Sequence, residues 1–506
     1  MSNCSTLGEL LSRGEEAHAA IRAPGAGPLG YGGLRQLIQT TVARLNSFGI
    51  GDGDRVAIVL PNGPEMATAF LAVASGATAA PLNPAYRTEE FQFYMSDLAA
   101  KALIVEAGST SPALAVARDL GITILTLTPA PQEGAGTFIL DCAAPTGPAR
   151  STGKASPEST ALILHTSGTT SRPKIVPLSQ KNICVSAANV AATLALSPAD
   201  CGLEIMPLFH IHGLIAGLLA PLYAGGSVFC TPGFNALRFF AWVEEADPTW
   251  YTAVPTMHQT ILTRASHNRD IIARHPLRFV RSSSASMPPQ VIAEIEATFN
   301  APLIEAYGMT EAAHQMASNP LADRRKPGSV GPAAGPEIAI MDAVGHLLPP
   351  QATGEIVIRG ANVTSGYENN AKANAEAFSD GWFRTGDQGT IDDDGYLHLT
   401  GRLKEIINRG GEKISPREVD EILMDHPAVA QVVTFAMPHD KLGEDVAAAV
   451  VLRDGQEASE TELRDFVKSR IATFKVPRRI VFLHEIPKGA TGKLQRIGLA
   501  EKLGLG

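Results

Sequence analysis

The chain contains 506 residues, more than one compact domain of roughly 100–200 residues holds, so we expect a large N-terminal body and at least one smaller unit. Hydrophobic residues make up 45% and charged residues 18%, a balance that supports sizeable cores and excludes global disorder. The net charge of -9 argues against bulk binding of nucleic acid, which favours a basic surface.

Further classes of protein are excluded by what the chain lacks. No apolar run reaches the roughly 18 residues of a membrane span. The N-terminus has neither the basic region nor the apolar stretch of a secretory signal. The 5 cysteines are scattered without a C-x-x-C pair, which argues against a metal or disulfide framework and favours a reducing compartment. We therefore expect a cytoplasmic protein without a membrane span.

The N-terminal half alternates short apolar runs with helix-like stretches. Residues 55–60 (RVAIVL) predict a buried strand, and residues 65–75 predict a helix that ends at Gly76. Further buried strands are predicted at residues 101–106, 122–127 and 161–165. Such strands separated by helices indicate parallel α/β layers. Residues 130–159, rich in Ala, Gly, Pro, Thr and Ser, are expected to form a surface loop.

The pattern changes in the second half of the chain. Between residues 354 and 399, short Gly-bounded segments with alternating hydrophobicity predict antiparallel strands. A compact α+β pattern follows, with helices at residues 416–424 and 460–470 and strands at residues 429–436 and 445–452. The predicted fold is α/β, with a large N-terminal domain of layered sheets and helices that includes a β-rich subdomain (residues 1–402). A small α+β C-terminal domain (residues 403–506) completes it.

Common nucleotide and hydrolase motifs are weak or missing. Residues 25–30 match GxGxxG formally, but no strand precedes them and Pro28 favours a turn over a helix start. The patterns GxxxxGK[ST], HExxH and GxSxG are absent from the sequence. These absences argue against a P-loop NTPase, a zincin and an α/β-hydrolase.

The most informative local segment is HTSGTTSRPK at residues 165–174. A predicted strand runs into a hydroxyl-rich loop that ends in two cations, Arg172 and Lys174. Hydroxyls and backbone N–H groups can surround phosphate oxygens, and the cations add charge. Taken alone, the same residues would suit a polar surface turn equally well.

Four further segments follow in order: EAYGMTE at residues 305–311, TGD at 385–387, GRLK at 401–404 and PKGATGKLQR at 487–496. Together the five segments resemble the adenylate-forming superfamily of acyl-CoA synthetases, adenylation domains and luciferases, over essentially the whole chain. The resemblance implies an acid–CoA ligase that uses ATP, Mg²⁺ and coenzyme A and passes through an acyl-adenylate. It also implies that the C-terminal domain is mobile.

The resemblance assigns nucleotide contacts residue by residue. The loop at residues 166–174 would hold the β- and γ-phosphates, Tyr307 would lie against adenine, and Asp387 and Arg402 would grip the ribose hydroxyls. The full set implied for ATP or AMP is Thr166, Ser167, Gly168, Thr169, Thr170, Lys174, Ala306, Tyr307, Thr310, Asp387, Arg402 and Lys493.

Three of the implied residues are catalytic. Thr310 would contact the α-phosphate, Glu311 would hold Mg²⁺, and Lys493 would bridge the acid and the α-phosphate. The chemistry requires such groups, because a carboxylate and a triphosphate are both anions and cations must be supplied where they meet. The basic C-terminal segment suits this role, since residues 475–506 contain seven basic and two acidic residues.

The remaining family positions concern coenzyme A and domain movement. Lys404 stands at the family's hinge position. Gly410 and Gly411 match the turn over which the pantetheine thiol enters, where missing side chains let the backbone and the ligand approach closely.

The segments that build the acid pocket in this family carry polar side chains here, where a fatty-acid enzyme would have apolar groups. They contain His210, His212, His258, Ser282, Ser283, Ser284, Ser286 and His314. Any one of these histidines would by itself be explained as a core residue. Together the donors favour a small polar acid, because a buried second carboxylate needs partners.

Several departures from the superfamily pattern point to one branch of it. Ser171 and Ile175 replace usual glycines, and Ser283 and Ser284 stand in the usual SGAAPL-like segment. Ser171 and the serine-rich segment are shared with the oxalate–CoA ligase branch, which the motifs HTSGTTSRPK, PLFHIHG and RSSSASMPP resemble. That resemblance implies acid contacts by His210, Ser283, Ser284 and His314.

Alternatives to oxalate remain open at this point. A malonate enzyme, or another short-chain, medium-chain or aryl acid–CoA ligase, would fit the same superfamily motifs. A domain that loads a separate carrier protein is a further alternative. A non-catalytic nucleotide-binding paralogue is disfavoured because the chain retains Glu311, Asp387, Arg402 and Lys493.

Overall fold

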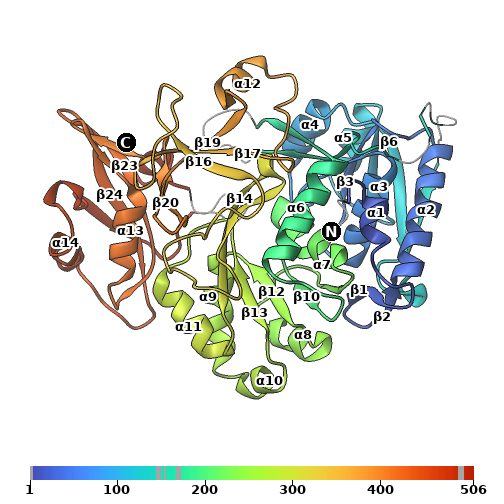
Figure 1. The fold of residues 1–506 in the computed structure, drawn as a ribbon, viewed down its shortest axis with the longest axis horizontal. Coiled ribbons are helices and arrows are strands. Elements are labelled where there is room, and N and C mark those ends of the chain that lie inside the picture. The colour runs from blue at the N-terminus through green and yellow to red at the C-terminus, as the bar shows by residue number, and fades with distance from the viewer. Residues whose placement is uncertain (1–3, 144–148, 150, 153–154, 167–172, 488–494) are drawn as a thin grey trace.

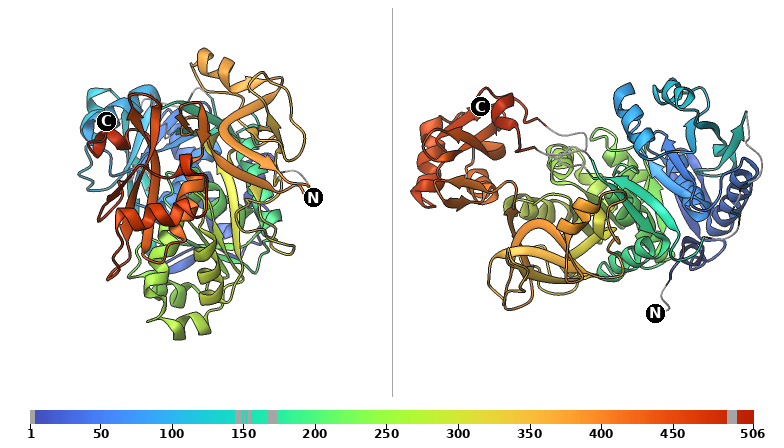
Figure 2. Two further views of the ribbon diagram at one scale, coloured as in Figure 1. Left: turned by 90° about the vertical axis from the view of Figure 1, so that its left-hand side faces the viewer. Right: turned by 90° about the horizontal axis from the view of Figure 1, so that it is seen from above.

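The computed structural model describes residues 4–506 except residues 144–148, 150, 153–154, 167–172 and 488–494. Two large sheets with helices on their faces form the N-terminal body (Figure 1). The elements that follow residue 402, dark orange and red, form a separate body on one side of these sheets (Figures 1 and 2). Within the described ranges, every helix is too short or too polar to cross a lipid bilayer.

The first sheet has the strand order β7-β6-β5-β3-β4-β8-β9. Its strands are β3 (Arg55–Val59), β4 (Thr78–Pro81), β5 (Ala102–Glu106), β6 (Thr123–Pro129), β7 (Phe138–Cys142), β8 (Thr160–His165) and β9 (Ile175–Ser179). The pairs from β6 to β8 are parallel, whereas β7 and β9 are antiparallel edges. The accompanying helices are α2 (Tyr31–Ser47), α3 (Pro64–Gly76), α4 (Thr88–Asp97), α5 (Ala113–Asp119) and α6 (Gln180–Thr193). The predicted parallel α/β layering is confirmed.

The second sheet has the order β15-β14-β13-β12-β10-β11-β1-β2. Its strands are β1 (Ala19–Ala23), β2 (Ala26–Gly30), β10 (Cys201–Glu204), β11 (Ser227–Cys230), β12 (Trp250–Ala253), β13 (Phe279–Ser282), β14 (Leu303–Met309) and β15 (His314–Ser318). All neighbouring strands from β14 to β1 are parallel. The associated helices are α1 (Leu7–Leu11), the π-helix η2 (His212–Leu219), α7 (Ala220–Tyr223), α8 (Phe239–Ala246), α9 (Pro255–Ala265), α10 (Arg269–Arg274) and α11 (Pro289–Phe299).

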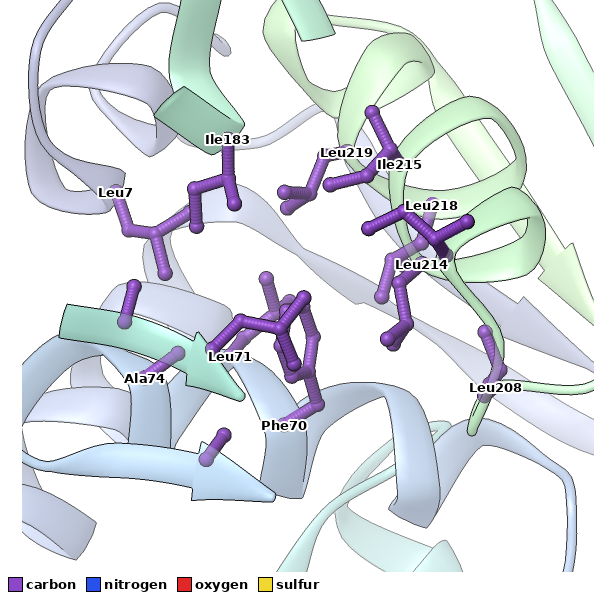
Figure 3. Packing of buried hydrophobic residues seen from close by; sticks show 14 of the residues in the cluster. Leu7, Phe70, Leu71, Ala74, Ile183, Leu208, Leu214, Ile215, Leu218 and Leu219 are labelled. Atoms are coloured by element: carbon purple, nitrogen blue, oxygen red, sulfur yellow. The ribbon is translucent and has the colours of Figure 1, made fainter. Parts of the chain in front are cut away.

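The helices between the two sheets share one hydrophobic core (Figure 3). Phe70 and Leu71 of α3 and Leu214 and Leu218 of the π-helix are all fully buried in it. These buried contacts hold the π-helix, which begins at His212, in place. Single π-helical turns are uncommon and often occur at functional sites, and the polar residues described below lie at this end of the helix.

Two segments with unusual composition can be compared with their predicted structure. The prediction of a loop for residues 130–159 is wrong in part, because it contains a 3₁₀ turn (Pro131–Glu133) and strand β7, which pairs with β6. Phe138 and Leu140 of β7 are buried on alternate positions, a short period-2 pattern hidden by the small-residue composition around it. The formal GxGxxG forms the β1–β2 hairpin, as the turn prediction requires, with Gly25 at φ 67°.

The β-rich part and the C-terminal part follow in sequence order. An antiparallel sheet is formed by β16 (Glu337–Met341), β17 (Gly354–Arg359), β18 (Phe378–Ser379), β19 (Trp382–Ile391) and β20 (Leu397–Arg402), with helix α12 (Ala371–Ala377). The last part contains β21 (Ile407–Arg409), β22 (Glu412–Ile414), α13 (Pro416–Met424), β23 (Val429–His439), β24 (Gly443–Leu452), α14 (Glu460–Lys468), β25 (Arg479–Phe482) and α15 (Leu499–Lys502). Its buried side chains form clusters of their own. The boundary that we propose at residue 402 coincides with the end of β20.

Glu204 is a buried acid that supports the chain where it leaves β10 toward the π-helix. It is 1% exposed, and its Oε1 accepts a hydrogen bond from the backbone N–H of Met206. A side chain at Gly217 would collide with its carboxyl group, so this glycine makes room for the acid. Oε2 has no partner in the described part of the chain. Burial raises the pKa of Glu204 well above its usual value.

Glu204→Gln should stabilise the protein increasingly as the pH rises. The folded chain keeps this acid protonated to a higher pH than the unfolded chain, which ionises it above about pH 4, so the wild type loses stability as the pH rises toward the raised pKa. Glutamine does not titrate. Thermal unfolding between pH 5 and 9 should show a widening difference in Tm, which the exposed control Glu133→Gln should lack. A difference that stays constant across this range would contradict a raised pKa of Glu204.

Candidate active site

The candidate site lies where the carboxyl ends of parallel strands meet. Strands β12, β13 and β14 are adjacent and in register, so the residues that follow them share one edge of the second sheet. Strand β8 of the first sheet leads into the phosphate-loop segment at Thr166. Ligands of layered α/β proteins bind at such edges, because the loops there converge.

Three of the predicted nucleotide residues form one hydrogen-bonded group. The Tyr307 hydroxyl donates to Oδ2 of Asp387 at 2.5 Å, and the Arg402 Nε lies 3.1 Å from Oδ1 of the same carboxylate. Register pairing of β19 with β20 places Asp387 opposite Arg402. Burial and the nearby Asp387 charge raise the pKa of Tyr307, and the Asp387 charge raises the pKa of Arg402. The structure thus brings together the residues expected at adenine and ribose.

The phosphate-loop segment is closed at its base by its two described ends. The backbone N–H of Thr166 donates to the Lys174 carbonyl at 3.0 Å, and the Lys174 N–H donates to the Thr166 Oγ1 at 3.1 Å. These contacts continue the antiparallel β8–β9 pairing. The predicted phosphate contacts at Ser167, Gly168, Thr169 and Thr170 lie outside the described residues.

Glu311 and Lys174 meet at Tyr367. The Lys174 ammonium lies 4.3 Å from the centre of the Tyr367 ring, and the Tyr367 hydroxyl donates to the Glu311 Oε1 at 2.8 Å. Glu311 is 6% exposed, and burial raises its pKa while Tyr367, Lys174 and Arg402 oppose that rise. Thr310 precedes it as the first residue of a 3₁₀ turn (Thr310–Ala312).

The donor set fits a magnesium–nucleotide complex better than a metal cage made of protein alone. Among the residues that the structure describes, no group of three or more His, Cys, Asp or Glu side chains could hold a metal ion. Mg²⁺ commonly uses one or two carboxylates together with substrate phosphates and water. A single buried carboxylate, Glu311, close to Lys174 of the phosphate-loop segment meets that requirement.

The predicted acid-pocket residues converge on two stacked imidazoles. The His212 and His314 rings lie 4.9 Å apart with an interplanar angle of 19°. The His212 Nδ1 lies 3.0 Å from the Ser284 Oγ, and the His212 Nε2 lies 2.6 Å from the Thr252 Oγ1. Ser283 is engaged otherwise, since its hydroxyl donates to the Ala306 carbonyl at 2.9 Å.

Two of these residues have backbone conformations that L-amino acids seldom adopt. Ser284 has φ 75° and His314 has φ 99°. Such conformations cost about 1–3 kcal/mol each and are concentrated at functional sites. The observed strain at both residues therefore supports a role for their side chains in ligand contact.

The other two histidines of the predicted pocket behave differently from each other. His210 is partly exposed just before the π-helix, with its ring 5.7 Å from that of Phe209. His258 is fully buried, its Nδ1 lies 3.1 Å from the Tyr251 hydroxyl, and burial lowers its pKa to about 3. His258 is thus a neutral core histidine whose ring contacts Tyr251.

The predicted coenzyme A turn and hinge lie beyond β20. Gly410 and Gly411 connect β21 to β22 with φ 61° and 99°, so both need the conformational freedom of glycine. Lys404 is exposed in the turn that joins β20 to β21. Lys493 lies outside the described residues, but Arg496 shortly after it is bonded to Asp420 at 2.6 Å and to Glu405 at 3.2 Å. Arg496 thus ties the C-terminal segment to α13 and to the neighbour of the predicted hinge residue.

Family comparisons agree with this geometry. The family model for AMP-binding enzymes matches residues 12–368, and the model for the AMP-binding enzyme C-terminal domain matches residues 418–493. The chain belongs to the AMP-binding enzyme family. The superfamily resemblance inferred from the five motifs is therefore confirmed.

Individual relatives of this AMP-binding enzyme cover nearly its full length. It is 46% identical to oxalate–CoA ligase of Arabidopsis thaliana, with 94% of each chain covered. It is 43% identical to oxalate–CoA ligase of Saccharomyces cerevisiae, with 88% of this chain and 86% of the relative covered. Among solved structures, ATP-bound MatB from Rhodopseudomonas palustris has a TM-score of 0.88 at 29% identity, with 98% of both chains covered.

No role was predicted for the residue that links the two stacked histidines. Arg281, on β13, is fully buried and contacts both stacked histidines. Its only sequence signal is a basic residue within a short strand, FVRS, that leads into the serine-rich segment. A charged side chain at such a position is seldom buried without a specific partner.

Proposed function

We propose that this chain is an ATP-dependent acid–CoA ligase that forms AMP and pyrophosphate, and that its acid is oxalate. The observation that carries the choice of acid is the fully buried Arg281 guanidinium with its two histidines, on strand β13 next to the strand that carries Tyr307. A cationic, donor-rich pocket favours a small acid with a second negative charge over an aliphatic one. The two oxalate–CoA ligases at 43% and 46% identity support the same acid.

In the first half-reaction, a carboxylate of the acid attacks the α-phosphate of ATP and displaces pyrophosphate. Asp387 and Arg402 would orient the ribose, while Thr166, Lys174 and the residues between them would hold the β- and γ-phosphates. Thr310 and Lys493 would contact the α-phosphate, and Lys493 would offset repulsion between the two anions. Glu311 would hold Mg²⁺, which when bound supplies positive charge to the phosphates.

In the second half-reaction, the thiol of coenzyme A replaces AMP on the acyl group. We propose that residues 403–506 rotate as a unit about Lys404, relative to residues 1–402, between the two steps. The Gly410–Gly411 turn would then line the path of pantetheine, where the absence of side chains leaves space. We also propose a cytoplasmic location for the protein. The cysteines that the structure describes are free, as expected in a reducing compartment.

The acid pocket would recognise oxalate by the second carboxylate of the acid. Ser284 and His314 would donate to that group, with His210 at the partly exposed side of the pocket. Ser283 would act indirectly, because its hydroxyl is already bound to the Ala306 carbonyl. Each hydrogen bond to a charged group contributes about 1.5–3 kcal/mol, enough to select a dianion over an acid of similar size.

A panel of oxalate, malonate, acetate, hexanoate and coumarate tests the proposal. Oxalate should give the highest kcat/KM, by about 10-fold or more over malonate, because one extra methylene group alters the fit by roughly 1–3 kcal/mol. Pyrophosphate release should require acid and ATP, and AMP release should also require coenzyme A. A preference for hexanoate would refute the choice of oxalate. AMP release independent of coenzyme A would refute the acid–CoA ligase activity.

A further inference from the structure

We infer that Arg281 fixes the tautomers of His212 and His314, so that Ser284 presents a proton to the anionic end of the acid. Arg281 is in this view a positioning residue, which determines specificity by charge through its neighbours. The inference rests on the proposed function for the identity of the acid. The proton positions themselves follow from the ligand-free geometry.

Arg281 is surrounded by groups that can accept hydrogen bonds. One terminal nitrogen lies 3.3 Å from the His212 Nε2 and 3.4 Å from the Thr252 Oγ1. The other lies 3.1 Å from the His314 Nε2 and 3.2 Å from the Gln315 Oε1. The side chain is fully buried, so water does not compete for these contacts.

A guanidinium group only donates hydrogen bonds, and this fixes the state of both imidazoles. A ring nitrogen that receives an N–H from Arg281 must be unprotonated, so Nε2 is the acceptor on His212 and on His314. The proton of each neutral ring is then on Nδ1. Burial lowers the pKa of Arg281 to about 9, which still leaves it charged at neutral pH.

The tautomer of His212 determines what the Ser284 hydroxyl can do. Nδ1–H of His212 donates to the Ser284 Oγ across 3.0 Å, so the serine oxygen acts as an acceptor there. The hydroxyl proton of Ser284 is then directed to another acceptor, and Ser284 is partly exposed. Arg281, His212 and Ser284 thus form a relay that ends in a donor. His314 carries a second proton on Nδ1.

The charge of Arg281 has no protein counterion among the residues described. Its contacts are two imidazoles, a hydroxyl and an amide, and its Nε has no hydrogen-bond partner. Arg278, three residues earlier, instead pairs with Asp200 at 3.1 Å. A buried cation without a counterion is costly, and an anionic ligand nearby relieves that cost. The cluster is therefore suited to a dianionic acid. It should disfavour an acid of the same shape whose second carboxylate is replaced by a neutral group.

The tautomers can be measured directly by NMR on ligand-free wild-type protein with ¹⁵N-labelled histidine. Signals of His212 and His314 are assigned by their loss in His212→Gln and His314→Gln. Both rings should be neutral Nδ1–H tautomers at pH 7.5, and Arg281→Gln should add Nε2–H signal at one or both. A wild-type Nε2–H or doubly protonated ring at either residue would overturn the inference, whichever acid the enzyme uses.

Binding of oxalate and oxamate tests the consequence for specificity, because oxamate replaces one carboxylate by a neutral amide of the same size. Calorimetry is carried out with α,β-methylene-ATP bound. Arg281→Gln should weaken oxalate binding by about 10–150-fold, the effect of losing a hydrogen bond to a charged group, and should change oxamate binding much less. Arg281→Lys should retain part of the preference, and the control Arg278→Gln should retain all of it.

The outcomes separate this inference from the proposed function. If wild-type enzyme does not use oxalate but both histidines are Nδ1–H, the proposed acid is wrong and the assignment of proton positions stands. If Arg281→Gln weakens oxalate and oxamate equally, Arg281 is structural and the inference fails. If that variant does not fold, Arg281→Lys and the wild-type NMR measurement decide the matter.

Discussion

Replacing Lys493 by Ala should slow acyl-adenylate formation by about 10²–10³-fold or more, the effect of losing a preorganised charge at the reacting centre. Thioester formation from a supplied acyl-adenylate should largely survive. The reason is that two anions meet only in the first step, and the C-terminal domain is proposed to rotate away for the second. ATP–pyrophosphate exchange measures the first half-reaction, and release of AMP from acyl-adenylate and coenzyme A measures the second.

Gly411→Leu should have the opposite effect on the two half-reactions. Gly411 has φ 99°, and an added Cβ would meet nothing within 4 Å, so a leucine side chain has room to project from the turn. The left-handed conformation adds a cost of about 1–2 kcal/mol, small enough for the domain to remain folded. This variant should retain pyrophosphate exchange and lose thioester formation. Equal losses in both half-reactions for Lys493→Ala would contradict a role restricted to adenylation.

The position of Arg496 makes the Lys493 experiment specific. Arg496 is bonded to Asp420 of α13 and to Glu405, and it also donates to the Thr434 carbonyl at 2.8 Å. The C-terminal segment is therefore held to its domain by a residue other than Lys493. Removal of the Lys493 charge leaves this attachment in place, so a loss of adenylation reports on the charge.

Much of the fold was predictable because its strands are short, apolar and well separated. Residues 416–424 form helix α13 as predicted, and the predicted strand at 101–106 differs from β5 by one residue. Strand β7 was missed because its period-2 burial extends over only five residues, within a segment whose composition indicates a loop. A pattern of that length predicts a strand only weakly, because the strand is stabilised mainly by pairing with its neighbour.

The candidate site was predictable only where the family motifs name its residues. Tyr307, Asp387 and Arg402 were expected at the nucleotide, and the structure brings them together. Arg281 gave no such signal, because its significance depends on His212 and His314, which are 69 and 33 residues distant in sequence. Contacts of that kind arise from the parallel order of β13 and β14 and the return of β15, which a single sequence does not display.

Ser284→Gly should change stability and activity in opposite directions. Ser284 has φ 75°, a region that glycine enters freely, so the glycine variant should gain about 1 kcal/mol or more in free energy of unfolding. It also removes the hydroxyl that the His212 Nδ1 contacts at 3.0 Å. Loss of a hydrogen bond to a charged substrate should lower kcat/KM for oxalate by about 10–150-fold. Thermal unfolding and initial rates measure the two effects on the same preparation.

Two further variants separate the hydroxyl from the backbone strain. Ser284→Ala keeps a Cβ in the strained conformation, so it should lose oxalate activity as the glycine variant does without gaining stability. Ala195→Gly relieves a similar strain, φ 45°, at an exposed position after α6, so it should gain stability and keep its activity. Full oxalate activity in both Ser284 variants would show that the Ser284 hydroxyl does not contact oxalate. An unchanged Tm in Ser284→Gly would instead show that packing around His212 compensates the strain.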